Sequence, residues 1–259
     1  MPQKYYFFIN RRMMATPHYT FTILKQVDST NNYAMGRVHE GLAKHGEAVF
    51  SGIQTSGKGQ RGKRWETGEG QNIALSIVIQ PTKLKAYHPF HLSAVVSLGV
   101  YDFFSKYAGA EASIKWPNDI FWRDRKAGGI LIENVMSASS WKWSVAGIGI
   151  NINQQEFDPL LVNAISLRQI TGLEHNPVML ANELHFAVMN RVRNAGEQSY
   201  ETVLAEYSKR LYKMNQNVRL KKDNMVFETT IRGISPQGRL ITKDVLEKEF
   251  EFGEVEWIL

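Results

Sequence analysis

The pattern of apolar and polar residues predicts three strands and one helix in the first third of the chain. YTFTILKQV (residues 19–27) alternates polar residues with β-branched or aromatic ones, which is typical of a strand, and GEAVFSGIQ (46–54) predicts a second strand. NIALSIVIQP (72–81) is apolar at nearly every position, as expected for a central strand that is buried on both faces. DSTNNYAMGRVHE follows the first strand, and Asp28 or Ser29 can cap a helix there.

The middle of the chain continues with helices and hairpins. PFHLSAVVSLGVYDFFSKY (residues 89–107) has apolar residues at helical spacing, and Pro89 suits the first turn of a helix. ASIKW, DIFWRD, GGILIENVM and WKWSVAGIGINI predict four successive strands with tight turns, and two polar residues interrupt the third of them. Residues 176–211 have the periodicity of two helices, which we expect to be broken near Ala195 and Gly196.

Beyond Met214 the pattern changes to short strands separated by turn signals, which indicates a small β-barrel. Strands and helices are intermixed with several hairpins, so the sequence predicts an α+β fold with a mixed β-sheet flanked by helices. We therefore expect a large domain over residues 1–213, of which residues 1–18 are a flexible extension. A small SH3-like β-barrel is expected over residues 214–259.

Composition excludes several classes of protein. Of the 259 residues, 43% are hydrophobic and 22% are charged, which is typical of a soluble globular protein. There is no cysteine, so a disulfide framework, a cysteine-ligated zinc site and a thiol nucleophile are all excluded. The absence of cysteine fits a reducing compartment. No apolar run is long enough for a membrane span, and the first residues do not form a signal peptide. We expect a cytoplasmic protein without membrane contact.

The net charge of +6 is compatible with a nucleic acid, an acidic protein or an anionic substrate as partner. Much of the excess lies in GKGQRGKRW (residues 57–65), a run that also suits an ordinary solvated surface. Its glycines allow the backbone to approach a ligand closely, and its cations can meet phosphate. The run contains G-x-G-x-x-G, but the strand pattern that follows differs from the helix and acidic residue of a dinucleotide fingerprint.

KWPNDIFWRDRKAGGIL (residues 115–131) carries the most specific chemistry. Pro117 enforces a turn, after which Asn118 and Asp119 offer oxygen ligands to a nucleotide–magnesium complex. Lys126 lies on the next hairpin, where its ammonium can meet developing negative charge. The glycine pair that follows leaves room for a flat ligand against the strand. Each feature alone is common in turns and on surfaces, but here they occur together.

Two further motifs have both a structural and a functional interpretation. In GIGININ (residues 147–153) the glycines either relieve crowding in the sheet or open a slot for an apolar ligand, with Asn151 free to contact a base edge. DSTN (residues 28–31) is an adequate helix cap, and its hydroxyls and amide equally suit a small polar head group such as a urea.

Taken together, DSTN, Q-x-x-G-x-G-x-x-G, KWPND, KAGGIL and GIGIN resemble the motifs of biotin protein ligases over residues 19–153. The resemblance implies an ATP-dependent ligase that converts biotin to biotinyl-5′-AMP and transfers biotin to a lysine of a biotin carboxyl carrier protein. It implies Mg²⁺ with the ATP phosphates, a catalytic domain ahead of the small barrel, and a homodimer. Only 27 residues precede DSTN, so we expect the ligase-only type without a specific DNA reader.

The resemblance also implies roles for individual residues. The residues expected to bind biotin are Ser29, Thr30, Asn31, Gln54, Lys58, Gly59, Gln60, Lys126, Gly128, Gly129 and Leu131. The residues expected to bind the nucleotide are Lys115, Asn118, Asn151, Arg61 and Lys63. The residues expected to take part in catalysis are Lys126, Asp119, Lys58 and Arg61, with Asp119 also a magnesium ligand.

Residues 57–63 are expected to be mobile without ligand and to close over the adenylate, while residues 154–163 cover the nucleotide. One departure concerns Gln60, where the family usually carries arginine; Arg61 is the candidate to replace its phosphate contact. Two alternatives stay open at this point. One is a lipoate or octanoyl ligase or transferase of the same fold, and the other is a basic nucleic-acid-binding protein.

Overall fold

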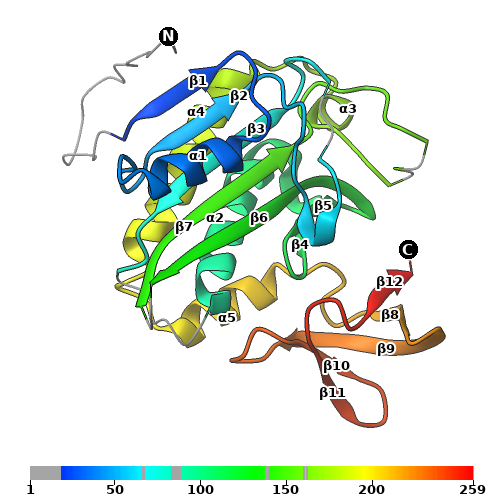
Figure 1. The fold of residues 1–259 in the computed structure, drawn as a ribbon. Helices are drawn as coiled ribbons and strands as arrows, with labels where there is room; N and C mark the ends of the chain where they lie inside the picture. Colours follow the sequence, from blue (N-terminus) through cyan, green and yellow to red (C-terminus); the bar gives the residue numbers. More distant parts are fainter. Residues whose placement is uncertain are drawn as a thin grey trace.

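A computed structural model of the chain describes residues 19–65, 68–82, 89–137, 140–159, 161 and 163–258. The extension predicted over residues 1–18 lies outside this range. Two sheets are present, a large one in the body of the molecule and a smaller one at the C-terminus (Figure 1). No helix among the described residues is both long and apolar enough to span a membrane.

The large sheet has seven strands in the order β1-β2-β3-β7-β6-β5-β4. β1 and β2 are parallel and every other neighbouring pair is antiparallel, so the predicted mixed sheet is confirmed. β3 lies between β2 and β7 and is buried along its whole length, as its apolar sequence predicts. The strands are β1 Phe21–Leu24, β2 Ala48–Ser51, β3 Ile73–Ile79, β4 Ala112–Lys115, β5 Asp119–Trp122, β6 Arg125–Ser137 and β7 Ser140–Ile150.

Helices cover both faces of this sheet (Figure 1). α1 (Thr30–His39) packs its apolar side on β3 and β7 across one face. The other face carries α2 (Pro89–Ala108) and α4 (Pro177–Asn194), and α5 (Tyr200–Lys209) follows the predicted break. The sequence pattern did not predict the short helix α3 (Leu167–Thr171), which the hydroxyl of Ser166 caps, or the 3₁₀ turns η1 (Gln60–Gly62) and η2 (Gly109–Glu111).

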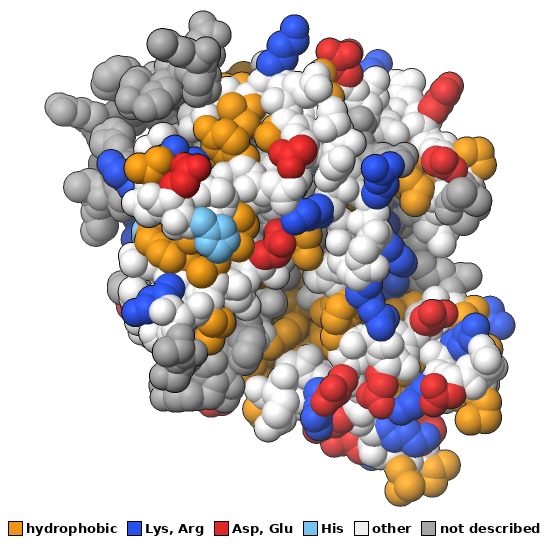
Figure 2. Space-filling model, in the orientation of Figure 1, with side chains coloured by type: hydrophobic (Ala, Val, Ile, Leu, Met, Phe, Trp, Pro, Cys, Tyr) orange, Lys and Arg blue, Asp and Glu red, His pale blue; other side chains and the backbone are white. Residues whose placement is uncertain are grey.

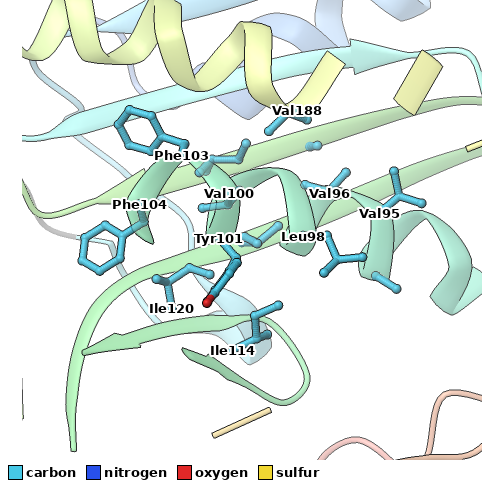
Figure 3. Close-up of a cluster of buried hydrophobic side chains, with 14 of the residues drawn as sticks. Val95, Val96, Leu98, Val100, Tyr101, Phe103, Phe104, Ile114, Ile120 and Val188 are labelled. Atoms are coloured by element: carbon cyan, nitrogen blue, oxygen red, sulfur yellow. The ribbon is translucent and has the colours of Figure 1, made fainter. Parts of the chain in front are cut away.

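The main core lies between α2, the sheet and α4. Most apolar side chains of α2 are almost completely buried in this core. In Figure 3, Tyr101 and Phe104 lie on the side of Ile120 in the sheet, whereas Phe103 points toward α4. Gly99 permits a close contact with α4, because a Cβ there would lie 2.7 Å from the Cα of Val188. The helices α2 and α4 thus cover one face of the sheet. The opposite face, next to α1, is left free to form a site.

The C-terminal sheet has five antiparallel strands in the order β11-β10-β9-β8-β12. The strands are β8 Asn217–Lys222, β9 Met225–Ile234, β10 Leu240–Lys243, β11 Glu247–Phe250 and β12 Glu256–Ile258. The small all-β unit is therefore confirmed, while its closure into a barrel stays a prediction. Trp116 holds this unit against the body, because its indole Nε1 donates a hydrogen bond to the carbonyl of Gly238 at 2.9 Å.

Candidate functional site

A row of small residues forms the floor of the main cleft. In the register of the sheet, Gly149 on β7 lies opposite Ala74 on β3 and opposite Gly129 on β6. Cross-strand neighbours point to the same face, so three adjacent strands present almost no side chain there. The same row continues to Asp119 on β5 and Lys115 on β4. The result is a cleft that is open to solvent and has a bare backbone floor.

The DSTN motif forms one end of this cleft. Gln54 Oε1 accepts hydrogen bonds from the backbone N–H and the hydroxyl of Thr30, at 2.8 and 3.1 Å. Ser29 precedes the first turn of α1 in an extended conformation, but its side chain makes no capping bond. Among the described residues, the Ser29 hydroxyl and Gln54 Nε2 have no hydrogen-bond partner. Both groups are therefore available to a polar ligand.

Asn31 is held from several sides. Its Nδ2 donates to Glu133 Oε2 at 2.8 Å and to the Leu131 carbonyl at 3.4 Å, while its Oδ1 lies 2.6 Å from the hydroxyl of Ser76. A Cβ at Gly147 would lie 2.3 Å from Asn31 Oδ1, so the glycine makes room for this amide. Both N–H donors of Asn31 are thus already used within the protein.

The KWPND turn and the following hairpin form the opposite end. Lys126 Nζ lies 2.7 Å from Asp119 Oδ1, and both side chains line the cleft. Asn118 Nδ2 donates to the Ile130 carbonyl at 2.7 Å, and the backbone N–H of Ile130 donates to the Asn118 carbonyl. These reciprocal bonds fix the turn against β6. An ammonium and a carboxylate are consequently held at the end of an otherwise uncharged floor.

The glycine-rich loop closes the third side. Trp65 N–H donates to the Gly57 carbonyl and Gly59 N–H donates to the Lys63 carbonyl, so the loop is a tight turn. The Trp65 ring lies on Gly149, where a Cβ would be 2.3 Å from a ring carbon. Its indole Nε1 is buried without a partner. This arrangement places an aromatic wall and a free donor over the cleft floor.

Two adjacent residues of the loop point in different directions. Gln60 turns inward and its Nε2 donates to the Ile130 carbonyl at 3.4 Å. Arg61 has a left-handed backbone with φ of 55° and turns outward to the C-terminal sheet. Its guanidinium donates to the Gly253 carbonyl at 3.4 Å and lies 5.7 Å from the ring centroid of Phe252. On the face shown in Figure 2, Lys and Arg side chains gather where the body meets this sheet.

Lys115 is a largely buried cation beside the cleft. Its ammonium lies 4.9 Å from the ring centroid of Phe121 and 5.5 Å from that of Trp257 on β12. Burial lowers the pKa of Lys115 to about 8; Asp119 opposes this shift, and the nearby ammonium of Lys126 adds to it. The C-terminal strand therefore helps to enclose a charged group that faces the reactive end of the cleft.

Most residues predicted for the site do meet at the cleft. The lining includes the predicted residues Ser29, Thr30, Asn31, Gln54, Lys58, Gly59, Asn118, Asp119, Lys126, Gly129 and Leu131. Gly128 faces the core, where a Cβ would lie 2.4 Å from Ile150. Asn151 is buried and its Nδ2 donates to the Ile165 carbonyl, so it joins β7 to the segment before α3. Lys63 and Arg61 lie outside the lining.

Sequence reasoning missed three residues of the site. Ser76 contacts both Thr30 and Asn31, and the signal for it was a polar residue inside an otherwise apolar central strand. Glu133 contacts Asn31 and Lys58, and its signal was a polar break in β6. Trp65 had no signal beyond its place next to the glycine loop, because only the fold brings it over β7.

Comparisons with known proteins agree with this geometry. Residues 23–153 match the model of the biotin/lipoate A/B protein ligase family. The bifunctional ligase/repressor BirA of Escherichia coli is 30% identical over 238 residues, which cover 90% of this chain and 72% of that protein. The biotin–[acetyl-CoA-carboxylase] ligase of Mycobacterium tuberculosis is 28% identical, with 84% of this chain and 81% of that protein covered.

The fold matches solved structures as well. The biotin protein ligase from Aquifex aeolicus, solved in complex with biotin and ATP, superimposes with a TM-score of 0.75 at 24% identity. The superposition covers 91% of this chain and 97% of that one. Because the family model spans half of the chain and a relative is 30% identical over most of its length, the chain belongs to the biotin/lipoate A/B protein ligase family.

Proposed function

We propose that the protein is a biotin–protein ligase that adenylates biotin with ATP and then transfers biotin to a lysine of a carrier protein. The observation that carries this proposal is the polarity of the cleft. One end offers the Ser29 hydroxyl and the Gln54 amide, the floor is bare backbone under Trp65, and the other end holds Lys126 and Asp119. Such a cleft suits a ligand with a urea-like head, an apolar middle and a carboxylate.

In the first step, a carboxylate oxygen of biotin attacks the α-phosphorus of ATP and the bond to pyrophosphate breaks. Both reactants are anionic, so the protein contributes mainly by placing them and by neutralising charge. Lys126 lines the cleft at the end where we expect the carboxylate. Its ion pair with Asp119 spans only 2.7 Å, and we propose that Lys126 shifts toward the substrate when its carboxylate arrives.

Magnesium enters this proposal through the nucleotide. Among the described residues no cluster of three or more His, Asp or Glu side chains forms a metal site. Mg²⁺ is commonly held by substrate phosphates together with one or two carboxylates, so the single carboxylate of Asp119 fits that pattern. When bound, the ion would neutralise phosphate charge, and Asp119 would be its ligand from this chain.

In the second step, the amine of the carrier lysine attacks the carbonyl carbon of the mixed anhydride, and AMP leaves with the electron pair. No cysteine is required because the activated acyl group stays on the nucleotide. We propose that the glycine-rich loop, whose Gly59 lines the cleft, covers the anhydride and excludes water, which would otherwise hydrolyse it. A carrier domain of acetyl-CoA carboxylase is the proposed acceptor, because relatives are named for that substrate.

ATP–pyrophosphate exchange tests the function directly. We expect exchange that depends on biotin and not on lipoate. The end of the cleft formed by Ser29 and Gln54 carries hydrogen-bonding groups that an apolar dithiolane ring would leave without partners. Exchange with lipoate alone would make the protein a lipoate ligase instead. A sequence-specific DNA footprint at physiological salt would favour the nucleic-acid-binding alternative; we expect at most weak binding that salt abolishes.

A further inference from the structure

We propose that Glu133 is a positioning residue that holds the glycine-rich loop and the DSTN helix in a fixed relation across the cleft. Its two carboxylate oxygens have different partners. Oε2 accepts a hydrogen bond from Asn31 Nδ2 at 2.8 Å, and Oε1 lies 3.5 Å from the ammonium of Lys58. The inference rests on the proposed function, since it assigns a role to a residue of the same site.

The sheet register explains why Glu133 can reach both elements. Leu131 and Glu133 are alternate residues of β6 and therefore point to the same face, the face that α1 covers. Glu133 lies opposite Val145 on β7, and Val145 in turn lies opposite Val78 on β3. The carboxylate thus ends a row of apolar side chains, and its two partners, Asn31 and Lys58, both line the cleft.

A carboxylate in this position requires compensation. The Glu133 side chain is only 31% exposed, so its charge is partly removed from water. The amide of Asn31 and the ammonium of Lys58 supply that compensation, one from α1 and one from the loop. Because Glu133 depends on both partners, it links α1 to the glycine-rich loop. The two partners, Asn31 and Lys58, are 27 residues apart in the sequence (58 − 31 = 27).

The link has separable consequences for the two partners. Through Asn31 it orients the amide whose Oδ1 meets Ser76, and Ser76 also lies 2.8 Å from the hydroxyl of Thr30. Through Lys58 it keeps a cation of the loop at the lining of the cleft. Glu133 therefore supports the polar end by a charge-assisted hydrogen bond to an uncharged amide, and it supports the loop by an ion pair.

Substitutions can separate these two effects. Glu133→Gln keeps an oxygen acceptor for Asn31 but removes the charge that attracts Lys58, whereas Glu133→Leu removes both contacts. The exposed pair of Glu111 with Arg123 provides a matched control, because Glu111→Gln makes the same chemical change far from the cleft.

We expect Glu133→Gln to lower single-turnover adenylate formation about two- to fivefold with little change in the KM for biotin, because a partly exposed ion pair contributes an effect of this size. Glu133→Leu should also raise that KM.

A double-mutant cycle with Lys58→Met tests the coupling. In the Lys58→Met background, Glu133→Gln should have no further effect on the rate. An equal effect of Glu133→Gln with and without Lys58 would overturn the proposal, and so would a native rate for Glu133→Gln alone. Because Glu111→Gln shares no contact with the cleft, a similar loss in that variant would show a general electrostatic effect and would also count against the link.

Hydrogen exchange without ligand separates failure of this inference from failure of the proposed function. The amides of Gly59 and Trp65 are hydrogen-bonded within the loop. They should exchange at least about twofold faster in Glu133→Gln than in the native protein, because the Lys58–Glu133 ion pair contributes a factor of this size to the stability of the loop. Faster exchange in a protein without biotin-dependent activity would support the role of Glu133 and contradict the proposed ligase function. Unchanged exchange in an active protein would contradict the role of Glu133 alone.

Discussion

The ammonium of Lys126 lies 2.7 Å from the carboxylate of Asp119, and the two residues come from adjacent strands of one β-meander. Each strand end is fixed independently, Asp119 by the turn after Pro117 and Lys126 by backbone bonds to residues 163 and 165. The pair thus keeps a cation in place before substrate binds. A substrate carboxylate can then replace the Asp119 carboxylate as the partner of the Lys126 ammonium, because the two groups carry the same charge.

This arrangement predicts a rate effect rather than a binding effect for Lys126→Ala. Adenylate formation should fall on the order of 100- to 1000-fold, because the lost charge acts mainly where negative charge builds up. Biotin affinity should change much less. Lys126→Arg should restore little activity, since a planar guanidinium does not replace a compact ammonium. Single-turnover kinetics and equilibrium biotin binding measure the two quantities, with exposed Lys142→Ala as control. A near-native rate in Lys126→Ala would remove this lysine from the reaction.

The bare floor of the cleft predicts that Gly149→Ala weakens biotin binding. The added Cβ would lie 2.3–2.8 Å from three carbons of the Trp65 ring, so the ring must leave its position. Overpacking of this kind costs about 1–3 kcal/mol, which corresponds to roughly a 5- to 150-fold change in an equilibrium constant, so we expect a loss of affinity of about tenfold or more. Isothermal titration with biotin measures it. Gly36→Ala on α1 is the control, because its Cβ has nothing within 4 Å and should leave affinity unchanged. Equal affinities in the two variants would contradict the role given to Trp65.

The glycine-rich loop should become ordered when substrates bind. Among the described residues, it is held by three internal backbone bonds, by the Lys58–Glu133 pair, by a 3.4 Å bond from Gln60 to the Ile130 carbonyl, and by the exposed contact of Arg61 with the C-terminal turn. Few buried contacts and several like charges predict fast local opening. Amide exchange over residues 57–63 should slow at least severalfold when biotin and ATP are both present. The same exchange rates with and without substrates would show that this loop does not close.

Much of the site was predictable because its chemistry is local. The KWPND turn, the glycine pair and DSTN each occupy a few consecutive residues, and the strand pattern places Asp119 at the start of one predicted strand and Lys126 on the hairpin that follows it. The small residues of GIGININ were open to two interpretations. The register resolves them, because Gly147 and Gly149 both face the cleft, one below Asn31 and the other below Trp65.

The remainder depends on contacts between distant segments, which periodicity does not encode. Nothing local indicates that Arg61 reaches Gly253, 192 residues away, or that Asn151 is buried against the Ile165 carbonyl. From the sequence alone, Glu133 is only a polar residue that interrupts an apolar strand. The register of the sheet shows that it lies beside Asn31. Likewise, the short helix α3 escaped prediction because five residues are too few for a helical period to be recognised.

Buried Lys115 predicts an unusual dependence of stability on pH. Burial between Phe121 and Trp257 lowers its pKa from the ordinary value of 10.5 to about 8. At pH values between these two, the unfolded chain binds more protons at this residue than the folded chain does. The free energy of unfolding contributed by Lys115 therefore rises as the pH increases from 8 toward 10.5, and it is lowest below pH 8, where the folded protein holds a buried charge.

Lys115→Met should remove this slope. Urea unfolding at pH 7.5, 8.25 and 9.0 stays at least one pH unit below the ordinary tyrosine pKa of about 10, so a comparison across these points isolates the lysine. We expect the native free energy of unfolding to increase over this range relative to that of Lys115→Met, with the largest advantage of the methionine variant at pH 7.5. Exposed Lys44→Met is the control and should run parallel to the native protein. Parallel curves for Lys115→Met as well would show that Lys115 is solvated in the folded protein. In that case Trp257 would not enclose it.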